Sequence, residues 1–255
     1  MGVEARTYVV TGGATGMGRA GVELLRERGA RVALIDLNDA EGQAAAVKTG
    51  ARFYHADVSD EAQVKAAFAA IDRDLGQIHG LWSNAGIQLA EALIHEETTE
   101  DWDRTINVNL RGTFLVVREA ISRFVAAGHA GAIVCTSSVV GRQAVPGGCN
   151  AYTATKGAID AFVRQVAVDY ASRRIRINSV APGAIDTPLM WGTTPPDQID
   201  HMRELVDMEI PIGKIGRPLD IAYCAVWLLS DEAAYVSGAS FAVDGALAAK
   251  LAISV

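Results

Sequence analysis

"YVVTGGATGMGRAGVELL", residues 8–25, joins a run of β-branched and aromatic residues to a glycine-rich turn and then to a helical pattern. Gly12, Gly16 and Gly18 lie directly after the expected strand and at the start of the expected helix. Glycines at such a turn let the backbone approach a pyrophosphate, and the helix N-terminus offers unpaired N–H groups and a positive dipole end. The spacing is Gly-x3-Gly-x-Gly, not the more general Gly-x-Gly-x-x-Gly. Taken alone, the glycines also fit a tight strand-to-helix turn that binds nothing.

The same alternation of short apolar runs and longer helical patterns continues along the chain. It predicts strands at residues 7–10, 31–37, 52–56, 79–83, 132–136, 176–180 and 240–243. It predicts helices near residues 17–28, 40–48, 60–75, 100–127, 151–172 and 218–230. Strands such as "VALI" and "AIVC" are apolar throughout, as expected when helices cover both faces of a parallel sheet. We therefore expect an α/β fold: a doubly wound, Rossmann-like, seven-stranded parallel sheet in a single domain over residues 1–255.

Composition excludes several classes of protein. The net charge of -7 gives no basic surface for nucleic acid or for an anionic membrane. No apolar run approaches the ~20 residues of a membrane span, and the N-terminus lacks the apolar core of a secretory signal. Cys135, Cys149 and Cys224 are too few and too widely spaced to indicate disulfides, and the five histidines fit no metal-binding spacing. A cytoplasmic protein without a metal site is expected.

Asp36 ends the second expected strand, 18 residues beyond Gly18. An acidic side chain near this offset can accept hydrogen bonds from the ribose hydroxyls of an adenosine, and it repels a 2′-phosphate. Leu37 follows where a phosphate site would often place a basic residue. NAD(H) is therefore favoured over NADP(H). The alternative is that Asp36 only caps the next helix, although Asn38 suits that cap better.

A tyrosine and a lysine lie four residues apart in "AYTATKGAIDAFVRQ", residues 151–165. Residues i and i+4 are neighbours on a helix face, so the Lys156 ammonium can lie close to the Tyr152 phenol. A free phenol has a pKa near ~10, and a nearby cation favours its ionised form. The pair can therefore make tyrosine a working acid or base. Alone, the pattern also fits an ordinary solvated helix face.

Other segments occur in the same order as in a known family. "AIVCTSSVVG" ends a strand with Ser138, and "INVNLRGTF" places Asn109 within a long helix. With "TGGATGMG", "NAG", "SSVVG", "YTATK" and "APGAIDTP", the chain resembles a short-chain dehydrogenase/reductase of the short, single-domain NAD(P)-dependent type over essentially its whole length. The combination is far more specific than any one segment.

The resemblance implies roles for four residues. Tyr152 would donate a proton in carbonyl reduction or accept one in alcohol oxidation. Lys156 would bind the nicotinamide ribose and lower the pKa of the phenol. Ser138 would hydrogen-bond the substrate oxygen. Asn109 would hold a water that links Lys156 to solvent.

The resemblance also implies a cofactor-binding set. It consists of Gly12, Thr15, Gly16, Met17, Gly18, Asp36, Leu37, Asp57, Val58, Asn84, Ala85, Gly86, Tyr152, Lys156, Pro182, Gly183, Ile185 and Thr187. Asp57 and Val58 would flank the adenine, and Ile185 and Thr187 would hold the carboxamide and phosphate.

The substrate side departs from the family pattern. The separation of Ser138 and Tyr152 is one residue longer than the common spacing, so "GRQAVPGGCN" contains an insertion and Ser137 remains an alternative hydroxyl. Residues 188–218 are rich in Pro and Gly, which interrupt regular structure, and are expected to form a substrate flap. The expected substrate contacts are Ser138, Gln88, Val145, Cys149, Met190 and Trp191.

The sequence thus predicts an NAD(H)-dependent oxidoreductase that interconverts a secondary alcohol and a ketone. The substrate is expected to be a small cyclic or hydrophobic alcohol. Alternatives are a 3-oxoacyl-thioester reductase, a sugar or polyol dehydrogenase, and a dinucleotide-binding sensor without catalysis. A homotetramer is expected, built on the apolar tail 247–255 and on two helix faces that carry Ile106, Leu110, Leu115, Phe162, Val166 and Tyr170.

Overall fold

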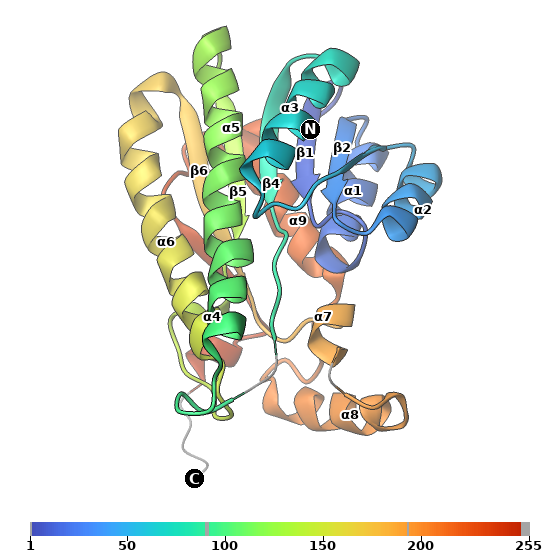
Figure 1. Ribbon diagram of the computed structural model, residues 1–255, viewed down its shortest axis with the longest axis vertical. Coiled ribbons are helices and arrows are strands. Elements are labelled where there is room, and N and C mark those ends of the chain that lie inside the picture. Colours follow the sequence, from blue (N-terminus) through green and yellow to red (C-terminus); the bar gives the residue numbers. More distant parts are fainter. Residues whose placement is uncertain (1, 90–91, 193, 251–255) are drawn as a thin grey trace.

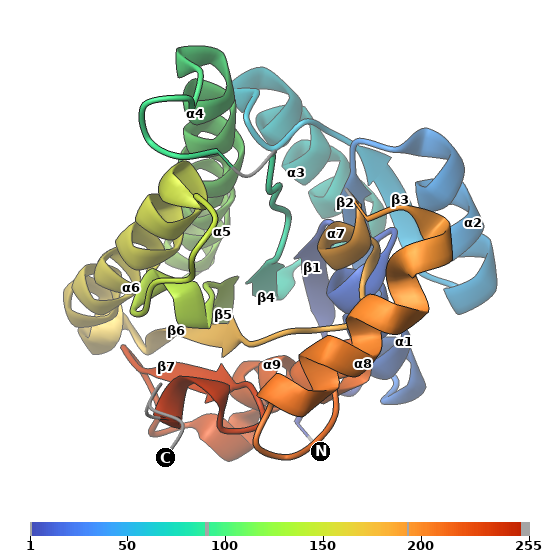
Figure 2. The same ribbon diagram turned by 90° about the horizontal axis from the view of Figure 1, so that it is seen from below.

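A computed structural model of the chain describes residues 2–89, 92–192 and 194–250. Seven parallel strands form one sheet in the order β3-β2-β1-β4-β5-β6-β7 (Figures 1 and 2). The strands are β1 Thr7–Thr11, β2 Arg31–Asp36, β3 Arg52–His55, β4 Ile78–Ser83, β5 Gly131–Thr136, β6 Ile175–Pro182 and β7 Ser240–Val243. The strand order reverses between β1 and β4, which is the position at which open α/β sheets bind ligands.

Helices cover both faces of this sheet, as Figure 2 shows. They are α1 Gly16–Glu27, α2 Asp39–Thr49, α3 Glu61–Leu75, α4 Thr99–Thr105, α5 Gly112–Ala127, α6 Asn150–Tyr170, α7 Pro188–Trp191, α8 Ile199–Glu209 and α9 Pro218–Leu229. Buried side chains of α3, α5 and α6 pack on one face. Those of α1, α2 and α9 pack on the other. The doubly wound fold expected from the sequence is confirmed.

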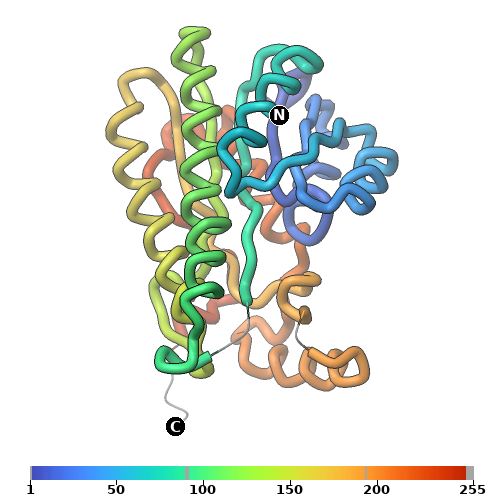
Figure 3. The backbone as a smooth tube through the Cα atoms, viewed as in Figure 1, coloured from blue at the N-terminus to red at the C-terminus, as the bar shows by residue number. Residues whose placement is uncertain are grey.

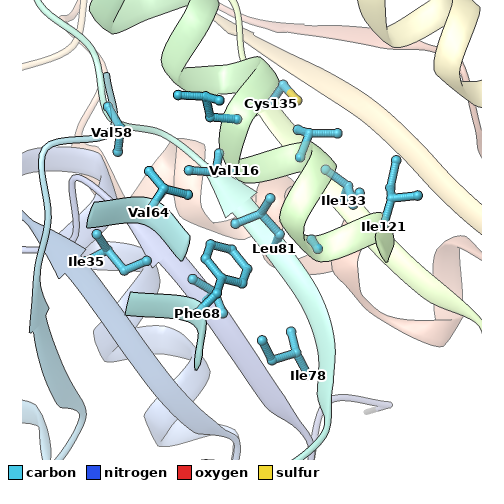
Figure 4. Packing of buried hydrophobic residues seen from close by; sticks show 14 of the residues in the cluster. Ile35, Val58, Val64, Phe68, Ile78, Leu81, Val116, Ile121, Ile133 and Cys135 are labelled. Carbon is cyan, nitrogen blue, oxygen red and sulfur yellow. The ribbon is translucent and has the colours of Figure 1, made fainter. Parts of the chain in front are cut away.

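The central strands β1, β2, β4 and β5 are largely apolar because each contributes side chains to both cores. In β1, Val9 packs in the cluster beneath α3, α5 and α6, while its neighbours Tyr8 and Val10 pack in the cluster beneath α1 and α9. Figure 4 shows the first cluster, in which Phe68 of α3 lies near Leu81 of β4. Alternate residues of a strand point to opposite faces, so a polar residue at any central position would be buried in one of the two cores.

Helix caps agree with local sequence. The Asn38 side chain accepts a hydrogen bond from the Glu41 backbone N–H at 3.2 Å and begins α2. Gly50 ends the same helix with φ of 70°, a left-handed conformation that glycine adopts without strain. Asn38 rather than Asp36 therefore caps α2, which leaves the Asp36 carboxylate for another role.

Strand boundaries agree with the sequence prediction within two residues at each end, but two helical regions differ. The helix expected at 100–127 contains a π-helical segment, Ile106–Arg111, where the Gly112 N–H bonds to the Asn107 carbonyl. Prolines and glycines were also expected to interrupt regular structure throughout 188–218, which is wrong. The 11 residues of α8 include neither proline nor glycine and form a regular helix (Figure 3).

The apolar faces expected at subunit interfaces are only partly exposed. Leu115 and Val166 are buried in the core, and Leu110, Phe162 and Tyr170 pack against it. For Leu115 and Val166 the expectation is wrong, because α5 and α6 need those positions to cover the sheet. Ile106, Leu110, Phe162 and Tyr170 are partly exposed, so their place at an interface stays a prediction. The exposed apolar residues on these helices are Phe114, Val125 and Val168. Of the expected apolar tail, residues 251–255 lie outside the described residues.

Candidate active site

The glycine-rich turn after β1 is shaped by two steric requirements. Gly12 has φ of 62°, in the left-handed region. A Cβ on Gly18 would lie 2.0 Å from the Gly12 carbonyl oxygen, so only hydrogen fits there. The turn brings the N-terminus of α1 to the carboxyl edge of the sheet, where its first N–H groups can meet an anion.

A cleft of about 570 Å³ opens at this edge, between the ends of β1, β2, β3 and β4. Twelve of the expected cofactor-binding residues line it. They are Gly12, Thr15, Gly16, Met17, Asp36, Leu37, Asp57, Val58, Asn84, Ala85, Gly86 and Thr187. A further wall of the cleft, which was not predicted from the sequence, comes from α4 and the π-helical segment and consists of Glu100, Arg104, Asn107 and Val108. The one indication of this wall in the sequence is that residues 100–108 directly precede the expected site residue Asn109.

The Asp36 carboxylate is oriented by two backbone donors. Its Oδ2 accepts from Ala14 N–H at 3.0 Å, and its Oδ1 accepts from Asn38 N–H at 3.1 Å. These bonds leave further lone pairs of the carboxylate directed at the cleft that Asp36 lines. Among the described residues that line the cleft, Arg104 is the only Lys or Arg.

Tyr152 and Lys156 occupy the first two turns of α6. Lys156 is 3% exposed, its Nζ lies 5.3 Å from the centre of the Tyr152 ring, and it donates to the Thr136 carbonyl at 2.8 Å. The Ser138 hydroxyl, which follows the end of β5, is close enough to the Tyr152 phenol to lower the pKa of that phenol through hydrogen bonding. The i, i+4 spacing therefore places the two groups together, and Ser138 joins them from another element.

Of the two candidate hydroxyls, Ser138 is the better placed. The Ser137 hydroxyl donates to the Lys156 carbonyl at 3.0 Å, a bond within the scaffold. Ser138 Oγ accepts from the Val140 N–H at 3.3 Å and donates to the Pro182 carbonyl at 3.5 Å, and it also lowers the pKa of the Tyr152 phenol through hydrogen bonding.

Asn109 lies in the π-helical segment and is 1% exposed. Its Oδ1 accepts from Ile87 N–H at 2.8 Å, and its Nδ2 donates to the Ile87 carbonyl at 2.9 Å. A Cβ on Gly86 would lie 3.3 Å from Asn109 Oδ1 and 3.6 Å from Lys156 Nζ, so these groups surround one small space. π-Helical turns occur often at functional sites, and this one fixes the chain that follows β4.

Burial controls the ionisation of the pair. It raises the pKa of Tyr152 to about 12, partly opposed by the hydrogen bond from Ser138. Burial also lowers the pKa of Lys156 to about 8, although the nearby Cys135 thiol and Asp160 carboxylate act in the opposite direction. The structure does not show the expected lowering of the tyrosine pKa, because the cost of burying a phenolate is the larger effect.

The other six expected cofactor-binding residues do not line the cleft, and they include Tyr152 and Lys156 as well as Gly18, Pro182, Gly183 and Ile185. Gly18 packs against the Gly12 carbonyl of the turn, and Pro182 is the last residue of β6. Gly183 packs on Asp244, where a Cβ would come within 2.7 Å of the Asp244 Cβ. Ile185 is buried, in the core beneath α1 and α9.

The expected substrate contacts divide into two groups. Gln88 Nε2 donates to Cys149 Sγ at 3.5 Å, so these two meet beside Tyr152. Met190 and Trp191 do not line the cleft, whereas Leu189 of the same turn does.

Two contacts hold the Trp191 side chain, which does not line the cleft. Its Nε1 donates to Asp186 Oδ1 at 2.7 Å, and the Arg203 guanidinium lies 5.7 Å from its ring centre. Val145 stands on the exposed loop before α6.

Comparisons with known proteins agree with this geometry. The family described as "Enoyl-(Acyl carrier protein) reductase" matches residues 12–247. The chain is 40% identical to 2-(S)-hydroxypropyl-CoM dehydrogenase 3 of Xanthobacter autotrophicus, over 94% of this chain and 95% of that one. It is 36% identical to 2,5-dichloro-2,5-cyclohexadiene-1,4-diol dehydrogenase of Sphingobium indicum, over 97% and 98%. The crystal structure of levodione reductase superposes with a TM-score of 0.91 at 33% identity, over 97% of this chain and 99% of that one.

The fold and the site define an oxidoreductase that uses a nicotinamide dinucleotide and acts on small molecules. The chain belongs to the short-chain dehydrogenase/reductase family. No helix within the described ranges is long and apolar enough to cross a membrane.

Proposed function

We propose that this protein is an NAD(H)-dependent dehydrogenase that interconverts a secondary alcohol and a ketone, with Tyr152 as the acid/base. The observation that carries the proposal is the meeting of three side chains from two segments: the Lys156 ammonium lies 5.3 Å from the centre of the Tyr152 ring, and the Ser138 hydroxyl is close enough to the phenol to lower its pKa. A structural role alone does not require a buried lysine here, because burying an ammonium is costly.

The chain's own residues fit a dinucleotide. The glycine turn and the N-terminus of α1 suit a pyrophosphate, and the cleft of about 570 Å³ has the size of a cofactor site. When bound, the nicotinamide supplies the hydride acceptor for alcohol oxidation or the hydride donor for ketone reduction.

The protonated phenol of Tyr152, stabilised by burial, is ready to give its proton to a substrate oxygen in ketone reduction. In alcohol oxidation the same oxygen must first lose its proton, so this direction is favoured at higher pH. Ser138 holds the substrate oxygen and stabilises negative charge on it as that charge develops. Lys156 supplies positive charge at the ring of Tyr152 and a donor for the cofactor ribose, and Asn109 keeps the chain at Ile87 in place.

NAD(H) is proposed over NADP(H) because of Asp36. Its carboxylate is fixed by two backbone donors at the cleft wall, where it can accept from ribose hydroxyls and repels a phosphate. Leu37, beside it, is 60% exposed and adds no positive charge.

The proposed substrate is a small cyclic or hydrophobic alcohol. The exposed Leu189 of α7 lines the cleft, and Leu93 after β4 and Val145 before α6 are also exposed apolar residues. The names of the relatives also indicate secondary alcohols, one of them a cyclic diol. A polyol dehydrogenase would suit these apolar surroundings less well. A 3-oxoacyl-thioester reductase would ordinarily need NADPH and a basic surface for a carrier protein, and Asp36 and the net charge of -7 disfavour both.

Residues 188–218 are proposed to act as the substrate flap, with α8 as its rigid part. We also propose a homotetramer, in which the exposed Phe114, Val125 and Val168 of α5 and α6 would be covered. Sedimentation at micromolar concentration tests this, and a monomer at all concentrations would contradict it.

A spectrophotometric screen tests the proposed reaction. The purified protein is mixed with cyclohexanol, cyclohexane-1,4-diol or 1-(methylthio)propan-2-ol, and with NAD or NADP, while the absorbance of the reduced nicotinamide is followed. We expect oxidation of at least one alcohol, faster with NAD. Tight NADH binding without turnover of any alcohol, or of the matching ketones in reverse, would instead support a dinucleotide-binding sensor.

A further inference from the structure

Asp160 is a buried carboxylate that the proposed mechanism leaves without a role. It lies on α6 one helical turn after Lys156 and is 4% exposed. Its Oδ1 accepts from Ser179 Oγ of β6 at 2.6 Å, and its Oδ2 accepts from Arg142 Nε at 2.9 Å. Burying a charged carboxylate is costly, and the attraction of an ion partner seldom exceeds that desolvation cost, so the presence of Asp160 points to a need for a fixed geometry.

Arg142 belongs to the segment that carries Ser138. A 3-10 turn, Val139–Gly141, follows Ser138 directly, and Arg142 ends it. The Arg142 side chain is half exposed, so it reaches inward to Asp160 from the surface. The ion pair therefore joins the segment of the substrate-binding serine to the helix of the tyrosine and lysine.

Two further contacts fix the same junction. The Ser137 hydroxyl donates to the Lys156 carbonyl at 3.0 Å. Gly141 packs directly on the helix, because a Cβ there would lie 2.8 Å from the Lys156 carbonyl carbon and 2.9 Å from the Gly157 nitrogen. The backbone at 137–142 thus lies against α6 at the level of Lys156, with Arg142 and Asp160 closing the contact one turn further on.

From this geometry we propose that the Arg142–Asp160 pair is a positioning device that fixes the Ser138 hydroxyl relative to Tyr152 and Lys156. The proposal rests on the proposed function, because it assigns the pair to that reaction. Reacting groups must be held within about 0.5 Å of the productive arrangement, and a shift of about 1 Å can reduce the rate about 100-fold. Without the ion pair, this loop would be held to α6 by the Ser137 hydroxyl and by the packing of Gly141, and its orientation would then be less fixed.

The test uses Asp160→Asn, which keeps the size of the side chain and removes its charge, and Arg142→Gln, which changes a half-exposed residue and preserves folding. The matched control is Asp169→Asn, since the Asp169 carboxylate also accepts a side-chain hydrogen bond on α6, from Gln165, but lies on an exposed surface. Rates are measured with NAD and the alcohol of the panel that the wild type oxidises fastest. NADH binding is measured by fluorescence.

In Asp160→Asn and Arg142→Gln we expect kcat to fall about 10- to 100-fold while the Kd for NADH and the KM for NAD stay within about twofold of wild type. Arg142→Lys should recover part of the loss. Hydrogen exchange at the amides of residues 140–143, which bond to Ser138 and Val139, should become faster in both variants and not in the control.

An active wild-type enzyme whose kcat is unchanged in both variants would overturn the positioning role, even if the melting temperature fell. A loss of kcat equal to that of Asp169→Asn would also overturn it. The proposed function would instead fail if the wild type oxidised no alcohol and reduced no ketone with either dinucleotide, so the two failures are distinct.

Discussion

Replacing Asp36 by Asn removes one negative charge and tests whether this carboxylate makes the protein prefer NADH to NADPH. The wild-type carboxylate is held by Ala14 and Asn38 N–H groups, at 3.0 and 3.1 Å, on the wall of the cleft. Two unit charges ~4 Å apart near a protein surface interact by about 4 kcal/mol at an effective dielectric constant of ~20. Because Asp36 is partly exposed and screened by salt, we expect a repulsion of about 1–2 kcal/mol against a 2′-phosphate. In Asp36→Asn, the hydrogen bonds from the ribose hydroxyls go to a neutral amide oxygen in place of a carboxylate, which weakens NADH binding by about 1 kcal/mol.

Together these effects should shift the ratio of NADPH to NADH affinity by about 25- to 150-fold toward NADPH. Fluorescence titration with NADH and NADPH measures both dissociation constants without any knowledge of the substrate. Asp39→Asn is the control, because Asp39 is exposed and bonds to His55 outside the cleft. A ratio that stays within about twofold of wild type in Asp36→Asn would refute the assignment of Asp36 to the ribose.

Three further substitutions test local physical arguments. Gly18→Ala places a Cβ 2.0 Å from the Gly12 carbonyl oxygen. We therefore expect a lower melting temperature and an affinity for NADH that is at least ~100-fold weaker. An affinity for NADH within threefold of wild type would contradict the steric argument. Burial lowers the pKa of His79, and the neutral ring accepts a hydrogen bond from the Thr7 N–H at Nδ1. The unfolded chain therefore binds a proton on His79 more readily than the folded chain does. The stability that neutral His79 contributes is lost as the pH falls below about 6.5, the pKa of histidine in the unfolded chain. His79→Asn keeps an acceptor without the titration, and its melting temperature should fall less than that of wild type between pH 7.5 and 5.5; an equal fall would exclude His79 as the cause. Ala246 has φ of 70°, in the left-handed region that is strained for alanine. Ala246→Gly should therefore raise the free energy of unfolding, measured by urea denaturation, by about 0.5–1 kcal/mol. A lower free energy of unfolding would show that the backbone at residue 246 is not strained.

The sheet was predictable because its signals are local. Each strand is a short apolar run that must be buried on both faces, and a glycine-rich turn between the first strand and the first helix is typical of dinucleotide-binding folds. The order of strands and the reversal between β1 and β4 depend on how distant segments pair, which periodicity does not encode. Helix α8 was missed because the prolines and glycines around it were given more weight than the 11 residues between them.

The candidate site was predictable where residues share one helix. The i, i+4 spacing brings Tyr152 and Lys156 together wherever α6 lies. The ionisation of the pair was not predictable, since burial comes from packing by other segments and raises the tyrosine pKa where the sequence favoured a lowering. The direction of Trp191 was also beyond the sequence, because it depends on Asp186 and on Arg203, which lies 12 residues further along the flap.

The central claim is that the Tyr152 hydroxyl transfers the proton, and Tyr152→Phe tests it most directly. The variant keeps the ring beside Lys156 and removes only the phenol oxygen. With NAD and an alcohol that the wild type oxidises, we predict a fall in kcat of about 100- to 10,000-fold, with the Kd for NADH within about twofold of wild type. A variant that retains more than about a tenth of the wild-type kcat would contradict the account.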